Sequence, residues 1–494
     1  MTKRATAFGL VLPPRGAGTL AYRWLYMTLR AEILEGRLRS GAKVPATRDL
    51  ARQYQLSRGT IVNAFELLKS EGYLRGAIGS GTYVSKILPD ALLQVTRTAS
   101  PRPSRQGKKN ASVSDYARRV HLFPAFDTRP SRAFRANVPA LDLFPTTLWA
   151  QLAARRWRRA SMHFLLGCGS MGHEPLREAV ADYLSTSRGV KCGPEQIAIV
   201  SGVQEALDLT ARLFLSPGDQ VSMEDPGYVG ARMVFEAVGA KVSAVRSDNE
   251  GMQVHGKNLR GSRLVYVTPG HQFPLGITMS LSRRLELLEW ARKSGALIFE
   301  DDYDSEYRYS GPPIPSLQGF DRNGLVIFAG SFSKVLFPSL RLGYLVIPQH
   351  LTSLFAATIS LTTRHTPLPE QAVLCDFITE GHFGRHLRRM REVYAERLSV
   401  LLECAREKLA DLLEISAIEA GLQTVGWLRE GIDGESATKA AALRGVEVFP
   451  LSRYSRGRMA REGLQLGFAA VDAREIRRGV QDLAIALEEA SPRR

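Results

Sequence analysis

The chain is poor in cysteine and has no long apolar run. Four cysteines occur in 494 residues, and no two of them have the Cys-x-x-Cys spacing of zinc motifs. No apolar stretch approaches the ~18 residues that a membrane-spanning helix needs. The apolar segment at residues 8–12 is too short for a signal peptide. We therefore expect a cytoplasmic protein with no metal site and no membrane span.

Acidic residues are scarce in the first quarter of the chain. Residues 1–130 hold 22 Lys and Arg against 8 Asp and Glu, a net charge of +14, whereas residues 131–494 hold 44 against 41, a net charge of +3. A basic module joined to a nearly neutral body indicates nucleic-acid binding by the module. A basic solvated surface or tail is the plain alternative.

The basic module begins with three segments in which apolar residues recur at helical spacing. These segments are residues 19–36, 45–54 and 57–72. Thr47 is the expected N-cap of the second helix and Ser57 that of the third, because the side-chain oxygen of an N-cap accepts a hydrogen bond from the first turn. The third helix would leave its N-terminal turn exposed.

Two strand-like pieces follow within residues 73–84 and flank the turn Gly79-Ser80-Gly81, a pattern typical of a β-hairpin. Three short helices and a hairpin predict a winged helix-turn-helix, which we place over residues 15–88. In that fold the third helix enters the major groove of double-stranded DNA, and the glycine turn reaches the adjacent groove.

The remainder of the chain has a different organisation. Residues 89–130 are expected to form a flexible basic linker, because residues 100–114 are rich in Pro, Ser, Lys and Arg and almost lack apolar side chains. Residues 131–494 alternate apolar strand-like runs with helical stretches, which predicts an α/β doubly wound domain whose ligands lie at the carboxyl ends of the strands. A smaller C-terminal part is expected from about residue 370.

One lysine of this domain has the surroundings of a cofactor site. Lys334 stands in GSFSKVLFPSLRLG, directly after an expected strand, together with Ser331, Ser333 and Arg341. An amine beside groups that bind a phosphate is what a pyridoxal 5'-phosphate (PLP) enzyme requires, because the lysine forms a Schiff base and the hydroxyls and arginine hold the phosphate. A surface lysine on a loop is the plain alternative.

The segment FEDDYDSEYRY at residues 299–309 follows another expected strand. A carboxylate at that strand end can keep a pyridine nitrogen protonated, and Tyr303 can reach the ring hydroxyl. A solvated acidic turn is the alternative.

In VSGVQEAL, backbone N–H groups at Gly202, Val203 and Gln204 would face an anion at a helix N-terminus. In EDPGYVGAR, Tyr228 is placed where its ring could stack on a cofactor.

Taken in order, these segments resemble the MocR/GabR-type (PdxR-like) transcriptional regulators, which join a GntR-type winged helix to a fold-type I aminotransferase-like domain. The resemblance covers residues 20–84 and about 140–470. Its most specific stretches are SRGTIVNAFELLKSEGYLRGAIGSGTYV, EDPGYVGAR, TPGHQFPLGITMS, EDDYDSEYRY and SFSKVLFPSLRLGYLV. It implies a multidomain chain, with an α+β winged helix before an α/β PLP-binding domain.

The resemblance also implies a role for each residue. Lys334 would be the Schiff-base lysine, Asp301 would pair with the pyridine nitrogen, and Tyr303 would bond the ring hydroxyl. Tyr228 would stack on the ring. Those that would serve the phosphate are Val203, Gln204, Ser331, Ser333 and Arg341. In the winged helix the positions that would contact DNA are Arg48, Ser57, Arg58, Thr60 and Gly79. We expect Arg58 to read a base and Arg48 to contact a phosphate.

The chain departs from aminotransferases where they bind substrate. Phe273-Pro274-Leu275-Gly276 replaces Asn-Pro-Thr-Gly, and Cys168-Gly169-Ser170-Met171 replaces a stretch that carries a tyrosine for the partner's phosphate. Gln465 stands near the place of the substrate-carboxylate arginine, and Gly230 replaces an arginine of GABA-responsive relatives. An incomplete carboxylate clamp argues against efficient transamination. The arginines that could substitute are Arg232, Arg453 and Arg456.

We therefore expect a PLP-dependent DNA-binding transcriptional regulator that acts as a homodimer. Its small-molecule effector would be PLP itself or an amino compound, and it would not be a physiological enzyme, although a residual aminotransferase half-reaction is compatible with the residues. The alternative is a PLP-dependent aminotransferase with a secondary DNA-binding module. A DNA-binding protein with an idle cofactor fold would leave Lys334 without a role.

Overall fold

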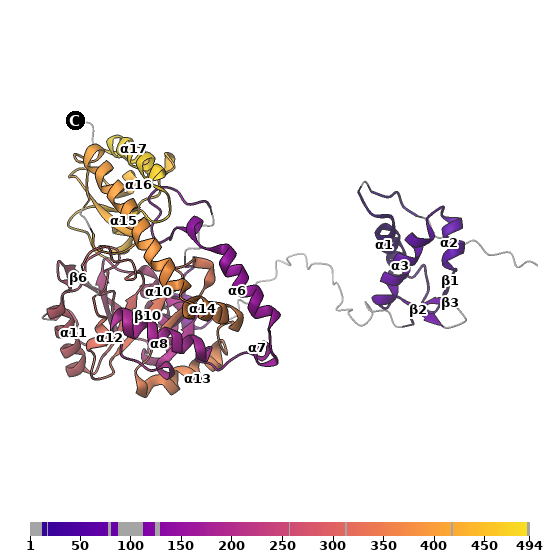
Figure 1. The fold of residues 1–494 in the computed structure, drawn as a ribbon, viewed down its shortest axis with the longest axis horizontal. Helices are drawn as coiled ribbons and strands as arrows, with labels where there is room; N and C mark the ends of the chain where they lie inside the picture. Colours follow the sequence, from indigo (N-terminus) through magenta and orange to yellow (C-terminus); the bar gives the residue numbers. More distant parts are fainter. Residues whose placement is uncertain are drawn as a thin grey trace, which may run out of the picture. The chain divides into compact units, whose positions relative to one another are not determined.

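The computed structural model describes residues 12–16, 18–77, 81–86, 112–123, 129–255, 257–311, 314–415 and 418–491. The chain separates into two compact units, residues 1–111 and 112–494, each with its own core (Figure 1). In the parts of the chain that are described, no helix is both long enough and apolar enough to cross a membrane.

The first unit is a winged helix, as the sequence predicts. Its elements are α1 (Ala21–Leu34), β1 (Lys43–Val44), α2 (Thr47–Gln53), α3 (Arg58–Ser70), β2 (Leu74–Ala77) and β3 (Gly81–Val84). The strands form an antiparallel sheet in the order β1-β3-β2. The apolar stripes expected on the helices are buried against one another, and their members are Leu25, Leu29, Ile33, Leu50, Ile61, Phe65 and Leu68.

One of the two expected helix caps is present. The hydroxyl oxygen of Ser57 accepts a hydrogen bond from the backbone N–H of Thr60 at 3.1 Å, which confirms Ser57 as the N-cap of α3. The expectation for Thr47 is wrong, because α2 already includes Thr47 and its N-cap is Ala46, which makes no side-chain cap. The predicted turn residue Gly79 lies outside the described residues.

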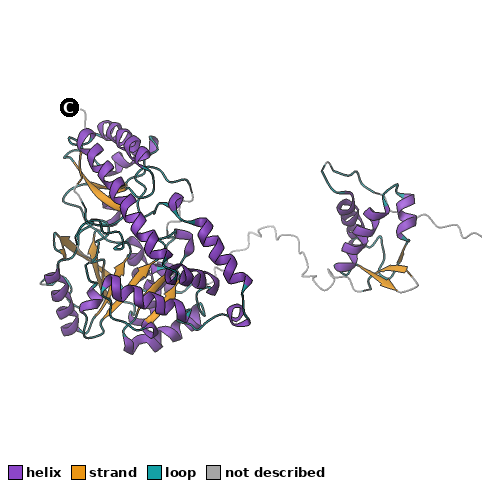
Figure 2. Cartoon of the chain, viewed as in Figure 1, coloured by secondary structure: helices purple, strands orange, loops and turns teal. Residues whose placement is uncertain are grey.

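In the second unit, helices surround a central sheet (Figure 2). This sheet has eight strands in the order β4-β11-β10-β9-β8-β5-β6-β7. Strands β11 and β7 run antiparallel to their neighbours, and the other six run parallel to one another. The bounds are β4 (Ile197–Val200), β5 (Gln220–Asp225), β6 (Lys241–Asp248), β7 (Gly251–Met252), β8 (Ser262–Val267), β9 (Leu297–Asp302), β10 (Val326–Ser331) and β11 (Gly343–Val346).

Helices pack on this sheet because its strands are buried on both faces. The helices of this part of the unit are α6 (Thr146–Arg158), α7 (Met162–Leu166), α8 (Glu174–Arg188), α9 (Val203–Phe214), α10 (Val229–Ala237), α11 (Leu281–Ser294), α12 (Leu317–Phe320), α13 (Thr352–Thr362) and α14 (Leu368–Thr379), and α6 packs on α14 rather than on the sheet. The alternation of strands and helices confirms the predicted α/β class.

The C-terminal part forms a smaller layer on the same unit. It holds α15 (His382–Lys408), β12 (Leu413–Ile415), β13 (Gln423–Leu428), α16 (Gly434–Leu443), β14 (Phe449–Pro450), β15 (Gly463–Gly467) and α17 (Ala473–Ala490). Its four strands pair antiparallel in the order β12-β13-β15-β14. Phe134 forms an isolated antiparallel β-bridge with Gly467 of β15, so a segment that precedes the large sheet in sequence pairs with the C-terminal sheet.

Part of the segment expected to be a flexible linker is ordered on the second unit. Residues 115–119 form a helix, α5 (Asp115–Arg119), which Ser114 caps by accepting from the N–H of Ala117 at 3.2 Å. Arg119 Nε donates to the carbonyl of Ala237 in α10 at 3.1 Å. Composition alone could not reveal this helix, since its contacts are to residues far along the chain.

Candidate cofactor site

The predicted cofactor residues meet at the carboxyl ends of the parallel strands. Lys334 lies in the loop after β10, and Tyr303 comes directly after Asp302, the last residue of β9. Tyr228 lies between β5 and α10 and is the N-cap of α10. Asp301 lies in β9 beside Ala329 of β10, in parallel register. A doubly wound sheet places ligands at this edge, because the loops after its parallel strands converge there.

Lys334 is held as an amine of lowered basicity. Its Nζ donates a hydrogen bond to the carbonyl oxygen of Asn137 at 2.9 Å. Burial lowers the pKa of Lys334 to about 8, the charges of Asp304 and Asp301 oppose that shift, and Arg341 adds to it. A lysine that titrates near 8 supplies a neutral amine close to physiological pH, which is the form that attacks a carbonyl.

Asp301 has one satisfied and one unsatisfied oxygen. Its Oδ2 accepts from the hydroxyl of Tyr266 at 2.7 Å, whereas its Oδ1 is buried and has no hydrogen-bond partner among the described residues. Burial raises the pKa of Asp301 to about 7, and the hydrogen bond from Tyr266 opposes this. A buried acceptor without a donor fits a protonated ring nitrogen of a bound pyridine.

Tyr303 belongs to a buried polar cluster. Its hydroxyl lies 3.0 Å from Nδ1 of His271, and the same nitrogen lies 3.0 Å from Oδ1 of Asp304. Burial and the nearby charges of Asp304 and Asp301 raise the pKa of Tyr303, so the phenol keeps its proton. A protonated phenol at this place can donate to an oxygen on a ligand ring.

The N-terminus of α9 and the loop after β10 form a cradle for an anion. Arg341 has a left-handed backbone (φ 51°), and a Cβ on Gly202 would lie 3.6 Å from its guanidinium nitrogens. The hydroxyl of Ser333 is buried and has no partner in the part of the chain that the structure describes. The first N–H groups of α9, at Val203 and Gln204, have no intrahelical acceptor. Ser331 accepts from the N–H of Ser333 at 3.2 Å.

Aromatic side chains close the remaining side of the site. Phe273 makes edge-to-face contacts with Tyr228 and Tyr303, each at 5.9 Å between ring centroids. Tyr454 makes a further edge-to-face contact with Phe273, with 5.1 Å between the ring centroids. Burial raises the pKa of Tyr228, with a smaller contribution from Asp301, so this ring stays neutral. Phe273, at the position of the missing asparagine, is therefore part of an apolar wall.

Gln465, near the place of the substrate-carboxylate arginine, contacts this wall, whereas Cys168-Gly169-Ser170-Met171 line a separate hollow. Gln465 is fully buried in β15 and accepts from the hydroxyl of Tyr454 at 2.7 Å. Arg456 is held by the large sheet, since its N–H donates to Asp225 at 2.9 Å and its guanidinium donates to the carbonyl of Val242 at 2.6 Å. The guanidinium carbon of Arg453 lies over the ring of Phe449, 4.8 Å from the ring centroid. Of the candidate substitutes, Arg232 lines a small hollow together with Arg456 and Tyr228.

Some residues of the site are missing from the sequence-based set. His271, Tyr266 and Asn137 each contact a predicted site residue, and Asp304 contacts His271. His271 and Asp304 stand inside motifs that were recognised, TPGHQFPLGITMS and EDDYDSEYRY. Tyr266 is an ordinary residue of a strand, and Asn137 precedes the first expected strand, so no local signal marks either of them.

Of the four predicted DNA-contacting residues that the structure describes, three are exposed and Thr60 is half-buried. Arg48 on α2 and Arg58 at the start of α3 are exposed, as is Ser57. The hydroxyls of Ser57 and Thr60 lie 2.8 Å apart, which fixes the first turn of α3. The long basic side chain of Arg58 therefore projects from a rigid helix end, which suits base contact in a groove.

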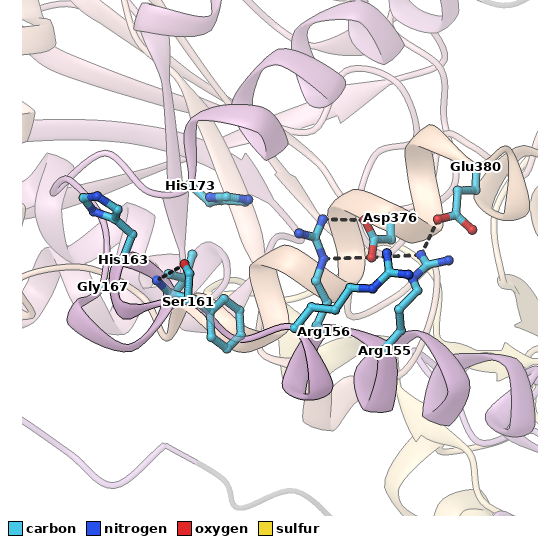
Figure 3. Close-up of a pocket in the computed structure, with 11 residues that line it drawn as sticks. Arg155, Arg156, Ser161, His163, Gly167, His173, Asp376 and Glu380 are labelled. Carbon is cyan, nitrogen blue, oxygen red and sulfur yellow. Dashed lines mark hydrogen bonds and ion pairs between the residues drawn. The ribbon is translucent and has the colours of Figure 1, made fainter.

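A second hollow of the second unit lies among α6, α7 and α14 (Figure 3). Its volume is about 560 Å³, and Arg155 and Arg156 line it. Both arginines pair with Asp376 of α14, and Arg155 also pairs with Glu380 (Figure 3). Exposed apolar side chains lie on α6 and α7, namely Trp157, Met162, Leu165 and Leu166, and Leu361 is exposed on α13.

Known proteins match the chain in two parts. The family of bacterial regulatory proteins called gntR matches residues 21–84, and the family of class I and II aminotransferases matches residues 134–482. Among solved structures, the kynurenine aminotransferase of Pyrococcus horikoshii, in complex with PMP, is 29% identical with a TM-score of 0.68 and covers 73% of this chain and 92% of its own. LysN of Thermus thermophilus, complexed with N-(5'-phosphopyridoxyl)-L-leucine, is 29% identical with a TM-score of 0.67 and covers 72% and 92%.

Regulators match both parts together. The probable rhizopine catabolism regulatory protein MocR of Rhizobium meliloti is 41% identical over 471 residues, 95% of this chain and 94% of that protein. The pyridoxine biosynthesis transcriptional regulator PdxR of Corynebacterium glutamicum is 30% identical over 451 residues, 91% and 92%. The full-length match favours a regulator over an aminotransferase with an added module. The chain belongs to the MocR-type transcriptional regulators, in which a GntR winged helix precedes an aminotransferase class I and II domain.

Proposed function

We propose that the second unit binds PLP through Lys334 and that this event controls DNA binding by the first unit. The observation that carries the proposal is the pair formed by Lys334, with its lowered pKa, and Asp301, with its unpaired buried oxygen. The aminotransferase fold also supports it, together with similar solved structures that carry pyridoxal-derived groups.

The residues present fit PLP part by part. Lys334 would bond the aldehyde carbon, Asp301 the ring nitrogen, and Tyr303 the ring hydroxyl. When bound, PLP would supply an electron sink in its ring and an aldehyde carbon that bonds an amine. The phosphate would lie against the N–H groups of Val203 and Gln204, the hydroxyls of Ser331 and Ser333, and the guanidinium of Arg341.

The effector is PLP itself or an amino compound that would take the place of Lys334 on the aldehyde carbon of bound PLP, with Lys334 released as the free amine. Gln465, whose amide oxygen accepts from the hydroxyl of Tyr454, stands near the place of the substrate-carboxylate arginine and carries no charge to pair with a carboxylate, so PLP itself is our preferred signal. Control of DNA binding requires the ligand to bind one arrangement of the protein more tightly than another. Because the partner is chromosomal DNA, we place the protein in the cytoplasm.

We further propose a homodimer. The exposed apolar side chains of α6 and α7, namely Trp157, Met162, Leu165 and Leu166, offer an apolar surface of the kind that marks an interface, and the ring contact between Trp157 and Phe164 joins the two helices. Two winged helices per dimer suit paired half-sites on DNA. Replacing Leu165 and Leu166 by Glu should convert the dimer to a monomer in sedimentation velocity. An unchanged sedimentation coefficient would assign the subunit contact to another surface.

The regulatory proposal is tested with DNA selected from random duplexes by the full-length protein. Affinity for that DNA is measured with and without PLP, for the wild type and for Lys334→Ala. We expect PLP to change the affinity of the wild type several-fold and to leave Lys334→Ala unaffected. Equal affinity of the wild type in both conditions, with PLP shown to be bound, would contradict control by PLP alone and would call for the same assay with a panel of amino compounds.

A further inference from the structure

His271 and Asp304 form a buried pair behind Tyr303. Nδ1 of His271 lies 3.0 and 3.1 Å from the two carboxylate oxygens of Asp304. The hydroxyl oxygen of Tyr303 lies 3.0 Å from the same nitrogen. The side chain of His271 is 2% exposed and that of Asp304 is 1% exposed. One ring nitrogen therefore faces two oxygen partners in a place without access to bulk water.

The position of one proton follows from this geometry. A ring nitrogen either donates or accepts, so Nδ1 cannot donate to Asp304 and accept from Tyr303 at once. A carboxylate only accepts, and a ring lone pair facing it in a buried place would be repulsive. The N–H of Leu422 donates to Oδ2 of Asp304 at 3.3 Å, which adds a second donor to the same carboxylate. Nδ1 consequently carries hydrogen and donates to Asp304.

The hydroxyl of Tyr303 then has no acceptor on its His271 side. Phe273 covers a second side of the phenol with its ring, 5.9 Å away. We propose that His271, held by Asp304, is a positioning residue that turns the hydroxyl hydrogen of Tyr303 away from the protein and toward the ring oxygen of the bound cofactor. This inference rests on the proposed binding of PLP at Lys334.

Two glycines make room for the imidazole in this place. A Cβ on Gly421 would lie 2.1 Å from Cε1 of His271, and a Cβ on Gly276 would lie 3.0 Å from its Nε2. Gly421 has φ +96° and donates its N–H to the carbonyl of Tyr307 at 2.9 Å. Gly421 and Leu422 lead directly into β13, so the C-terminal sheet braces the pair that orients Tyr303.

A matched pair of variants separates hydrogen bonding from bulk. In His271→Asn the amide nitrogen lies about where Nδ1 was, and in His271→Gln it lies about where Nε2 was. The readout is the pH midpoint of the visible absorbance of bound PLP in the full-length protein. A hydroxyl that donates to the ring oxygen stabilises negative charge there, so its loss raises this midpoint.

We expect Tyr303→Phe and His271→Gln to raise the midpoint by about 1 pH unit, a tenfold change in proton binding. His271→Asn should stay close to the wild type. The other titratable or charged groups around the site are the same in all variants, namely Glu224 from β5, Tyr228 from the start of α10, Tyr266 from β8, Asp301 and Asp302 from β9, Asp304, and Lys334 and Arg341 from the loop after β10.

Two results with the His271 variants would overturn the inference. One is a wild-type midpoint in His271→Gln, and the other is an equal shift of the midpoint in both variants. If His271→Gln does not fold, Asp304→Asn takes its place, because an amide holds the imidazole less firmly than a carboxylate. An upward shift supports the inference and an unchanged midpoint contradicts it. A wild type with no visible band after addition of PLP would instead refute cofactor binding itself.

Discussion

Tyr266 holds one oxygen of Asp301 and leaves the other without a donor. The hydroxyl of Tyr266 in β8 donates to Oδ2 at 2.7 Å, and Oδ1 finds no partner within the described ranges. Strands β8 and β9 pair in parallel register, with Tyr266 beside Phe299, so the sheet itself fixes this contact. The carboxylate is thus oriented by the protein before any ligand arrives.

We predict that Asp301→Asn weakens PLP binding by about 10- to 100-fold. The reason is the loss of a hydrogen bond to a charged group, worth ~1.5–3 kcal/mol. Tyr266→Phe removes only the orienting hydrogen bond and should cost less, about 0.5–1.5 kcal/mol. Absorbance titration of the cofactor-free protein measures both. Glu289→Gln, on the exposed face of α11, is the control and should bind like the wild type. Wild-type affinity in Asp301→Asn would refute its role.

The lowered pKa of Lys334 predicts how fast PLP is captured at each pH. The neutral amine attacks the aldehyde, and it predominates above the pKa, so the rate should rise with pH through about 8. An unperturbed lysine would give the same rise only near ~10.4. Stopped-flow absorbance at a fixed PLP concentration provides the profile. A midpoint above pH 10 would mean that burial does not act on this amine.

Gly202 has a counterpart that makes a matched test of the phosphate cradle. Gly202 (φ +118°) and Gly218 (φ +97°) share a left-handed backbone, but a Cβ on Gly202 would face Arg341, whereas a Cβ on Gly218 would meet no described atom within 4 Å. Both substitutions to Ala should cost ~1–2 kcal/mol of stability. We predict that Gly202→Ala also weakens PLP binding by about tenfold, and that Gly218→Ala does not. Equal cofactor affinity in the two variants would place the phosphate elsewhere.

In the winged helix, Arg58 and Arg48 should act differently. Arg58→Ala is predicted to weaken binding to the selected DNA by ~1–3 kcal/mol and to relax the preference at one base pair. Arg48→Ala should weaken binding to all sequences alike and reduce the salt dependence of binding. Lys69, at the other end of α3, provides the control substitution. Identical sequence preference in Arg58→Ala and the wild type would remove Arg58 as the base-reading residue.

The sequence predicts those parts of the fold that depend on local pattern. Apolar spacing predicts the three helices of the first unit, and the alternation of apolar runs with helical stretches predicts the α/β class of the second. Ser57 was recognisable as a cap because its hydroxyl acts within one turn. Thr47 is not the cap, because the helical backbone already begins at Thr47 and the N-cap is Ala46. The sequence pattern does not locate a helix start to within one residue.

Contacts that are distant in sequence escaped prediction. Asn137 reaches Lys334 across 197 residues, and Tyr266 reaches Asp301 from a neighbouring strand. The helix at Asp115–Arg119 depends on contacts with α10, more than a hundred residues away. His271 and Asp304 were visible in quoted motifs, but only the fold shows that both meet at the hydroxyl of Tyr303.

The most direct test of the account is where PLP becomes attached. The full-length protein is incubated with PLP, reduced with borohydride, digested and examined by mass spectrometry. We predict one pyridoxyl group per chain, on Lys334, and none at that stoichiometry in Lys334→Ala. Reduced PLP at wild-type stoichiometry in Lys334→Ala, or no modification of Lys334 in the wild type, would contradict the claim that this lysine is the cofactor's anchor.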